Sequence, residues 1–103
     1  MTKVGVGELA EWRGMSAEAA LIALADYAKR DATFVPLKDK TTSRWYAGAG
    51  GRDLELLITG PKFFDTRASV GGGGAIDLAM HLLRIDFRSA VEYLRRLKGQ
   101  GRL

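Results

Sequence analysis

The sequence predicts an α+β fold in which helices pack on one face of a small antiparallel sheet. Two observations predict the elements: apolar residues recur at helical spacing near both ends of the chain, whereas residues 33–68 carry strand-like segments separated by turns. A third concerns domain organisation. The 103 residues are 47% hydrophobic and 27% charged, without a repeat or linker, which indicates one module spanning residues 1–103.

The N-terminal part is predicted to form two helical pieces. A short amphipathic piece covers residues 8–13, and residues 1–15 are a candidate peripheral segment. After Gly14, a stronger alanine-rich helix extends to Arg30, with Ser16 as a suitable N-cap. The apolar stripe of that helix consists of Leu21, Leu24, Tyr27 and Ala28.

About four strands follow as an antiparallel meander. They are predicted at residues 33–37, 43–46, 53–59 and 62–67. Pro36 favours an edge position for the first strand, because proline cannot donate to a sheet ladder. Glycines 48, 50 and 51 connect the second strand to the third, and Gly60 with Pro61 marks the next turn.

Two helices are predicted to complete the chain, at residues 75–83 and from Phe87 onward with Asp86 as N-cap. The glycines at 71–74 precede the first of these helices. They favour a tight turn that allows close packing of helix on sheet, and the alternative is an anion site at the helix N-terminus. No Lys-Ser/Thr follows them, which excludes a Walker phosphate loop.

Composition excludes several classes of protein. The chain has no cysteine and one histidine, His81, which we expect to be a solvated or hydrogen-bonded surface residue. Disulfides, thiolate metal sites and cysteine nucleophiles are therefore excluded, and no carboxylate cluster indicates two-metal chemistry. We expect no enzyme activity, no cofactor and no metal.

Hydropathy and charge bear on location and partner. No apolar run approaches the ~18 residues of a membrane span, and no secretion signal opens the chain, so we expect a cytoplasmic protein with no membrane partner. The net charge is +4, carried by the last two-thirds of the chain. This favours an anionic partner, most simply nucleic acid, with a merely solvated basic surface as the alternative.

A run with a recognisable pattern occupies residues 63–78, FFDTRASVGGGGAIDL, and is followed by DFRSAVEYL at 86–94. It resembles the N-terminal zinc-binding domain of bacterial, plasmid and phage DNA primases. In that family a strand ends in aromatic-x-Cys-x-x-Cys, before a glycine-rich turn and a helix opening Ala/Val-Ile-Asp-Phe/Leu. The resemblance covers roughly residues 20–98 and is most specific in its last third.

The chain departs from this family at every zinc ligand. Thr66 and Ser69 stand where the second pair of ligands lies, and Ala47 and Gly50 stand near the first pair. Hydroxyls and glycine do not replace thiolates around zinc. The resemblance therefore implies a zinc-ribbon-like sheet without metal, a degenerate zinc finger.

Apolar packing must replace the roughly 10 kcal/mol that a structural zinc contributes. The candidates on the sheet and the N-terminal helix are Trp45, Tyr46, Leu56, Ile58, Phe64, Leu21, Leu24 and Tyr27.

The candidate binding residues lie on the predicted strands. In each of the pairs Trp45-Tyr46 and Phe63-Phe64, one ring faces the core and the other faces outward. An outward ring among cations is a platform for single-stranded bases. We expect Trp45 and Phe63 to stack bases, and phosphates to contact Lys38, Lys40, Arg44, Lys62 and Arg67. The resemblance implies template contacts on this same sheet.

A basic tail contains Arg95, Arg96, Lys98 and Arg102. These side chains either complement the dipole of the last helix or contact phosphates as well.

The leading hypothesis is a DNA-binding module for single-stranded DNA, a primase-like accessory in DNA replication of a plasmid, phage or other mobile genetic element. The alternative is a protein–protein adaptor that kept the fold, lost DNA binding and docks on a primase, helicase, polymerase or relaxase. A third hypothesis is a non-catalytic piece of a larger primase, since primer synthesis in that family belongs to a separate domain.

Overall fold

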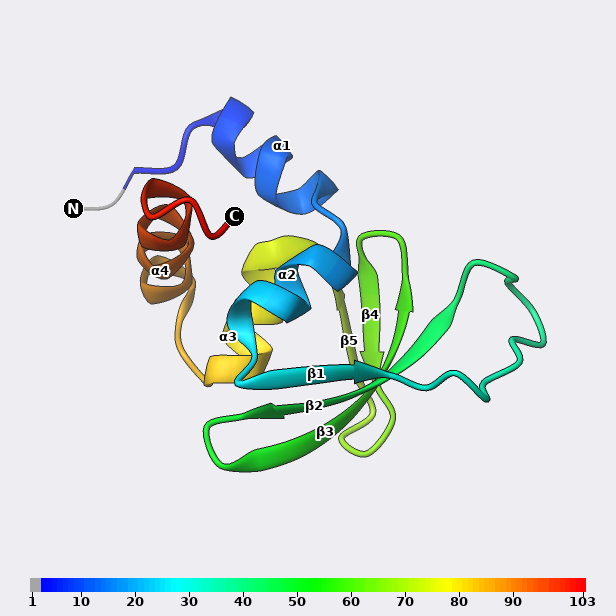
Figure 1. Ribbon diagram of the computed structural model, residues 1–103. Helices are drawn as coiled ribbons and strands as arrows, with labels where there is room; N and C mark the ends of the chain where they lie inside the picture. The colour runs from blue at the N-terminus through cyan, green and yellow to red at the C-terminus, as the bar shows by residue number, and fades with distance from the viewer. Residues whose placement is uncertain (1–2) are drawn as a thin grey trace.

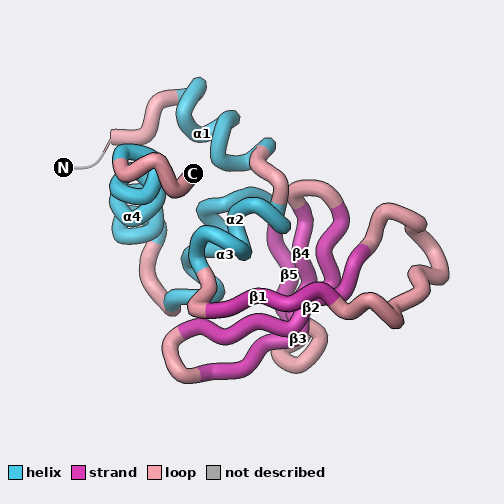
Figure 2. Tube along the Cα trace, in the orientation of Figure 1, coloured by secondary structure: helices cyan, strands magenta, loops and turns pink. Residues whose placement is uncertain are grey.

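The computed structural model describes residues 3–103 and contains an open five-stranded sheet with four helices (Figures 1 and 2). The elements are α1 (Val6–Gly14), α2 (Ala17–Leu24), β1 (Tyr27–Arg30), β2 (Ser43–Ala49), β3 (Arg52–Thr59), β4 (Lys62–Asp65), β5 (Val70–Gly73), α3 (Gly74–Leu83) and α4 (Phe87–Gly99). The strands lie in chain order and every neighbouring pair is antiparallel. The predicted α+β fold is confirmed, with one more strand than expected.

The helices gather on one side of the sheet, with α2 and α3 against it and α1 and α4 farther out (Figure 1). Burial along β3 follows this arrangement, because Leu54, Leu56 and Ile58 are buried while the residues between them are partly exposed. Strand periodicity therefore divides the sheet into a face toward the helices and an open face away from them.

Tight turns set the register of the central strands. Gly50 and Gly51 both have positive φ, at 57° and 77°, and form a two-residue turn between the paired residues Ala49 and Arg52. Positive φ at both turn positions matches the twist of a hairpin and is easily adopted by glycine. Because the register is fixed here, the apolar residues of β2 and β3 share the helix-facing side.

The first strand differs from the prediction. The alanine-rich helix ends at Leu24 rather than Arg30, and the chain then joins the sheet as β1. The N–H of Asp26 donates to the carbonyl of Gly48 at 2.7 Å, and the Tyr27 hydroxyl donates to Asp53 Oδ1 at 2.7 Å. These contacts with distant residues outweigh the local helix propensity of the segment.

Residues 33–37 form no strand and belong to the long loop 31–42. Asp31 and Asp39 each accept two hydrogen bonds, from the N–H and the hydroxyl of the threonine two residues later. Such side-chain bonds compete with strand pairing, which explains why the segment folds as turns. The glycine-rich residues 70–73 instead form the fifth strand, where a turn was expected.

The predicted helix caps are confirmed. Ser16 accepts a hydrogen bond from the N–H of Ala19 at 3.3 Å, and Asp86 accepts one from the N–H of Ser89 at 2.8 Å. Each side chain satisfies a donor that the first turn of a helix leaves unpaired.

The core lies between the sheet and the helices, and Trp45, Leu56, Ile58, Leu21 and Leu24 are all buried in it as predicted. Three other core candidates lie outside it: Tyr46 is partly exposed, and Phe64 and Tyr27 are exposed.

The candidate peripheral segment contributes Trp12, which is 1% exposed, and its residues 1 and 2 lie outside the described part of the chain. Within residues 3–103, no helix is both long and apolar enough to cross a membrane.

Candidate functional site

The open face carries two rows of side chains that run across the strands. One row aligns Lys29 with Tyr46 and Glu55, and the next aligns Arg44 with Leu57 and Phe64. Register partners in an antiparallel sheet point to the same side, so rings, an aliphatic side chain and cations lie together. No helix covers this face in Figure 1.

The two predicted base-stacking residues face the helices rather than the open side of the sheet. Trp45 and Phe63 are 6% and 4% exposed, because both alternate toward the helices. Each aromatic pair does divide between the two faces, but the open-face members are Tyr46 and Phe64. Phe64 is 43% exposed. Alternation alone predicts the division, while the choice of face depends on which residues the helices cover.

Arg44 and Arg67, two of the predicted cations, surround one carboxylate. Arg44 forms an ion pair with Glu55, and the Nε of Arg67 lies 3.8 Å from the same carboxylate. The Arg44 guanidinium also lies over the Tyr46 ring, 5.5 Å from its centroid, within cation–π range. Glu55 therefore partly neutralises the centre of the open face and positions Arg44, whereas Arg67 is a more distant and largely exposed partner.

The lysines at this end of the sheet are exposed. Lys62 lies at the start of β4 in register with Thr59, and Lys38 and Lys40 lie on the loop 31–42. None of the three forms an ion pair among the described residues. These lysines are the cations most available to an anionic ligand.

An apolar groove that the sequence did not reveal adjoins the open face. It has a volume of about 340 Å³ and is lined mainly by Phe34, Val35, Pro36, Leu37 and Leu57. Val35 is 74% exposed and Leu37 is 97% exposed. Leu57 pairs with Phe64 in the sheet, so the groove and the exposed ring lie on the same face.

Part of the basic tail pairs with α1. Arg95 donates to Glu8 Oε2 at 2.8 Å, and Lys98 donates to Glu11 Oε1 at 2.7 Å. The hydrogen bond from Arg95 lowers the pKa of Glu8 below its ordinary value. Two of the four basic tail residues thus form ion pairs within the chain. Arg96 lies over the Tyr93 ring, 5.4 Å from its centroid, and lines a separate pocket with Arg102.

His81 lies on the helix-facing side and is largely buried, although a surface position was expected. Its Nε2 lies 2.7 Å from Oδ2 of the buried Asp65, and its ring stacks on Phe63 at 5.7 Å. Burial raises the pKa of Asp65, but the N–H groups of Ala68 and Arg67 and the His81 ring outweigh it, leaving the pKa below its ordinary value. The pair joins β4 to α3.

The four residues that the resemblance aligns with zinc ligands have other roles in this fold. Ala47 is buried in β2 and Gly50 forms the turn after it. The hydroxyl of Thr66 donates to the Glu55 carbonyl at 3.3 Å, and Ser69 has a positive φ of 55°. Across residues 3–103, no group of three or more His, Cys, Asp or Glu side chains could hold a metal ion.

Comparison with known proteins gives a short match. The chain is similar to a "65 kDa protein" of Zymomonas mobilis subsp. mobilis, with 44% identity over 41 residues. That match covers 40% of this chain and 7% of the relative, so the chain spans a small fraction of that protein. No family model and no solved structure matches the chain. These comparisons assign no function to the chain.

Proposed function

We propose that the chain binds single-stranded DNA through the open face, as a non-catalytic, primase-like module in the replication of a plasmid, phage or other mobile element. One observation carries the proposal: the helices cover one side of the sheet and leave exposed rings among cations on the other. The pattern of residues 63–78 favours the same function, since the primase domains that it resembles use this sheet for template contacts.

Chemistry assigns distinct roles to these side chains. Phe64 offers an exposed ring face on which an unpaired base stacks, a contact worth about 1–3 kcal/mol per base. Tyr46, which carries the Arg44 guanidinium over its ring, extends the aromatic surface beside it. Lys38, Lys40 and Lys62 neutralise phosphates and give the binding its salt dependence. Glu55 positions Arg44 at the centre of the surface, with Arg67 as a more distant partner.

Titration of a fluorescein-labelled oligothymidine of about 20 nucleotides, followed by anisotropy, tests the proposal. Affinity should fall between about 50 mM and about 200 mM salt because phosphate contacts release counterions. Phe64→Ala should weaken binding at least fivefold through lost stacking, an effect that salt does not remove. Lys62→Glu should weaken binding and reduce its salt dependence.

Arg88→Glu on α4 is the matched control, since it reverses a charge on an exposed residue of the helical layer. Equal losses from Lys62→Glu and Arg88→Glu would mean that binding follows net charge rather than the open face. Affinity weaker than about millimolar at low salt would refute DNA binding.

The apolar groove favours a second candidate function, a protein–protein adaptor. Leu37 and Val35 expose aliphatic side chains that suit a protein surface better than a phosphate backbone. An adaptor would retain its partner in a pull-down from nuclease-treated lysate and lose it on Leu37→Lys. A DNA-binding module would lose co-purifying proteins when the nucleic acid is removed.

A further inference from the structure

The outer edge of β5 is open to strand addition. Among residues 3–103, β5 is the last strand of the sheet and no segment pairs with its outer side. The opposite edge strand, β1, ends in Lys29 and Arg30, charges that discourage edge pairing, whereas the sequence of β5 is Val-Gly-Gly-Gly. The strand itself contains no charged residue and no proline, and the Asp77 carboxylate of α3 covers only its last residue, Gly73.

Hydrogen-bond alternation shows which backbone groups face outward. The N–H of Gly74 donates to the Pro61 carbonyl at 2.9 Å, so these residues form a hydrogen-bonded pair. Such pairs alternate along an antiparallel ladder, and Gly71 and Gly73 therefore turn their backbone groups away from β4. Asp77 Oδ2 accepts from the N–H of Gly73 at 3.1 Å, which leaves Gly71 as the free donor and acceptor of the edge.

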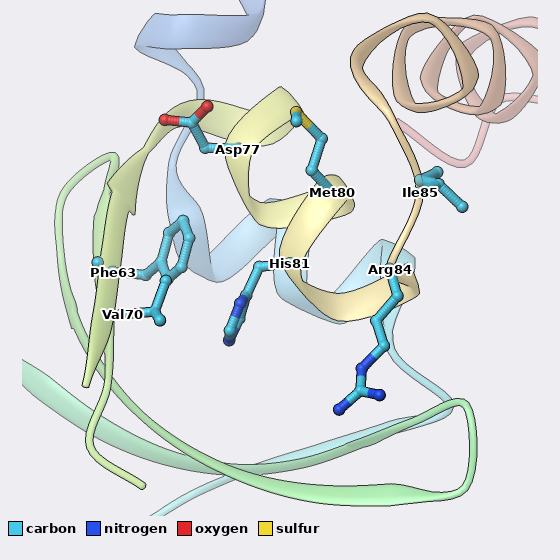
Figure 3. Close-up of a pocket in the computed structure, with 8 residues that line it drawn as sticks. Phe63, Val70, Asp77, Met80, His81, Arg84 and Ile85 are labelled. Atoms are coloured by element: carbon cyan, nitrogen blue, oxygen red, sulfur yellow. The ribbon is translucent and has the colours of Figure 1, made fainter. Parts of the chain in front are cut away.

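A cavity of about 420 Å³ lies directly beside this edge on the helix-facing side (Figure 3). Phe63 and Val70 line it from the strands, and Met80, His81 and Ile85 line it from α3 and the residues that follow. Val70 points toward this side in register with Asp65. A strand added beside β5 would place alternate side chains over the cavity, because strand side chains repeat every second residue.

Arg84 supplies a charge at the mouth of the cavity. It follows α3 with φ 53° and ψ 48°, a left-handed conformation that costs energy for any residue except glycine. The side chain is exposed and forms no ion pair among the described residues. An acidic group on an incoming chain would complement it.

We propose that β5 binds an extended peptide segment of a partner protein by strand addition, with an apolar side chain in the cavity and an acidic residue paired with Arg84. Gly71 would exchange two backbone hydrogen bonds with the peptide, and the cavity would select its side chain. The cavity lies on the helix-facing side of the sheet, so the inference does not depend on DNA binding by the open face.

A library of random linear peptides of about twelve residues, selected on the intact protein, provides the probe. Enriched peptides should share an apolar residue with Asp or Glu nearby. For the best peptide, Val70→Lys should weaken binding at least tenfold, because a charge pointing over the cavity opposes the apolar side chain. Arg84→Gly should weaken binding about fivefold, as expected for one exposed ion pair, while the glycine relieves the left-handed conformation.

Leu37→Lys is the matched control, because it places the same charge on an exposed apolar residue of the other groove, and binding should not change. Exchange of the Gly71 amide hydrogen should slow when the peptide binds, and a peptide methylated at the paired backbone nitrogen should bind weakly.

Three results would overturn the proposal. They are a selection without enriched peptides, binding that Val70→Lys and Arg84→Gly leave unchanged, and a Gly71 amide that exchanges equally with and without peptide. A fourth contradicting result would come from sedimentation analysis. If the wild type were a dimer and Val70→Lys a monomer, a second copy of the chain would occupy the edge instead of a partner peptide.

Discussion

Gly74 lies where helix α3 passes close to the backbone of α1, so the residue has no room for a side chain. It has φ +88°, and a Cβ there would lie 2.6 Å from the Cα of Arg13 and 2.9 Å from the carbonyl oxygen of Trp12. Backbone atoms cannot move aside as a flexible side chain can. Gly74→Ala should therefore reduce the free energy of unfolding by about 2–4 kcal/mol, through strain and overpacking together.

Gly73→Ala is the matched control, since a Cβ there meets nothing within 4 Å and φ is −142°. It should cost less than about 1 kcal/mol in urea unfolding, the range for alanine at an N-cap. Equal costs for the two substitutions would show that α1 does not pack against Gly74.

The Asp65 carboxyl should give the protein an acid-sensitive contact between β4 and α3. Its pKa is lowered in the folded state, so below the ordinary Asp value of about 3.9 the unfolded chain binds more protons. The resulting stability is fully present above that pH and is lost as pH falls through the folded-state pKa.

Asp65→Asn should cost about 1–3 kcal/mol at neutral pH and flatten the decline of stability in acid, measured by urea unfolding across pH. Glu8, Asp31, Asp39 and Asp86 also have lowered pKa values and account for the slope that remains. Asp39→Asn, at an exposed carboxyl of the loop 31–42, is the comparison and should flatten the acid slope less than Asp65→Asn. An unchanged acid slope in Asp65→Asn would contradict the assignment.

At the scale of elements, the N-cap of α4 makes a contribution to stability that can be measured. Asp86 accepts from the N–H of Ser89 at 2.8 Å, and that hydrogen bond lowers the pKa of Asp86. Asp86→Ala should reduce stability by about 1 kcal/mol. Arg88→Ala, which removes an exposed ion pair with Glu92 one turn along, should cost at most about 0.5 kcal/mol. A larger loss of stability from Arg88→Ala than from Asp86→Ala would contradict a stabilising role of the cap.

Elements with strong local signals could be predicted from the sequence. The caps Ser16 and Asp86, the glycine turn at 50–51 and the pattern of β3 all agree with the structure. Strand β1 could not be predicted, because its contacts with Gly48 and Asp53 join residues more than twenty positions apart. Strand β5 could not be predicted either, because its glycines show no apolar alternation and the strand forms only by pairing with β4.

The face on which each candidate ring lies could not be predicted from the sequence. Charge and adjacent rings indicated the sheet, but the choice between Trp45 and Tyr46, or Phe63 and Phe64, depends on which face the helices cover. The groove of loop 31–42 and the Asp65–His81 pair also depend on tertiary contacts, so no local pattern in the sequence indicates them.

At the scale of the whole molecule, charge is distributed unequally between the layers. The acidic side chains of α1 pair with the basic end of α4, which uses part of the C-terminal positive charge within the helical layer. Exposed lysines with exposed rings remain on the open face and the adjoining loop. This separation is the basis for the proposed assignment of nucleic-acid binding to the sheet rather than to the basic tail.

Amide chemical shifts of the isotope-labelled protein, followed while oligothymidine is added, test this assignment most directly. Binding to the open face predicts that the perturbed amides cluster in β2, β3, β4 and the loop 31–42, with α4 unaffected. Perturbations centred on Arg96 and Arg102 with an unchanged sheet would contradict it, as would a spectrum that the oligonucleotide leaves unchanged.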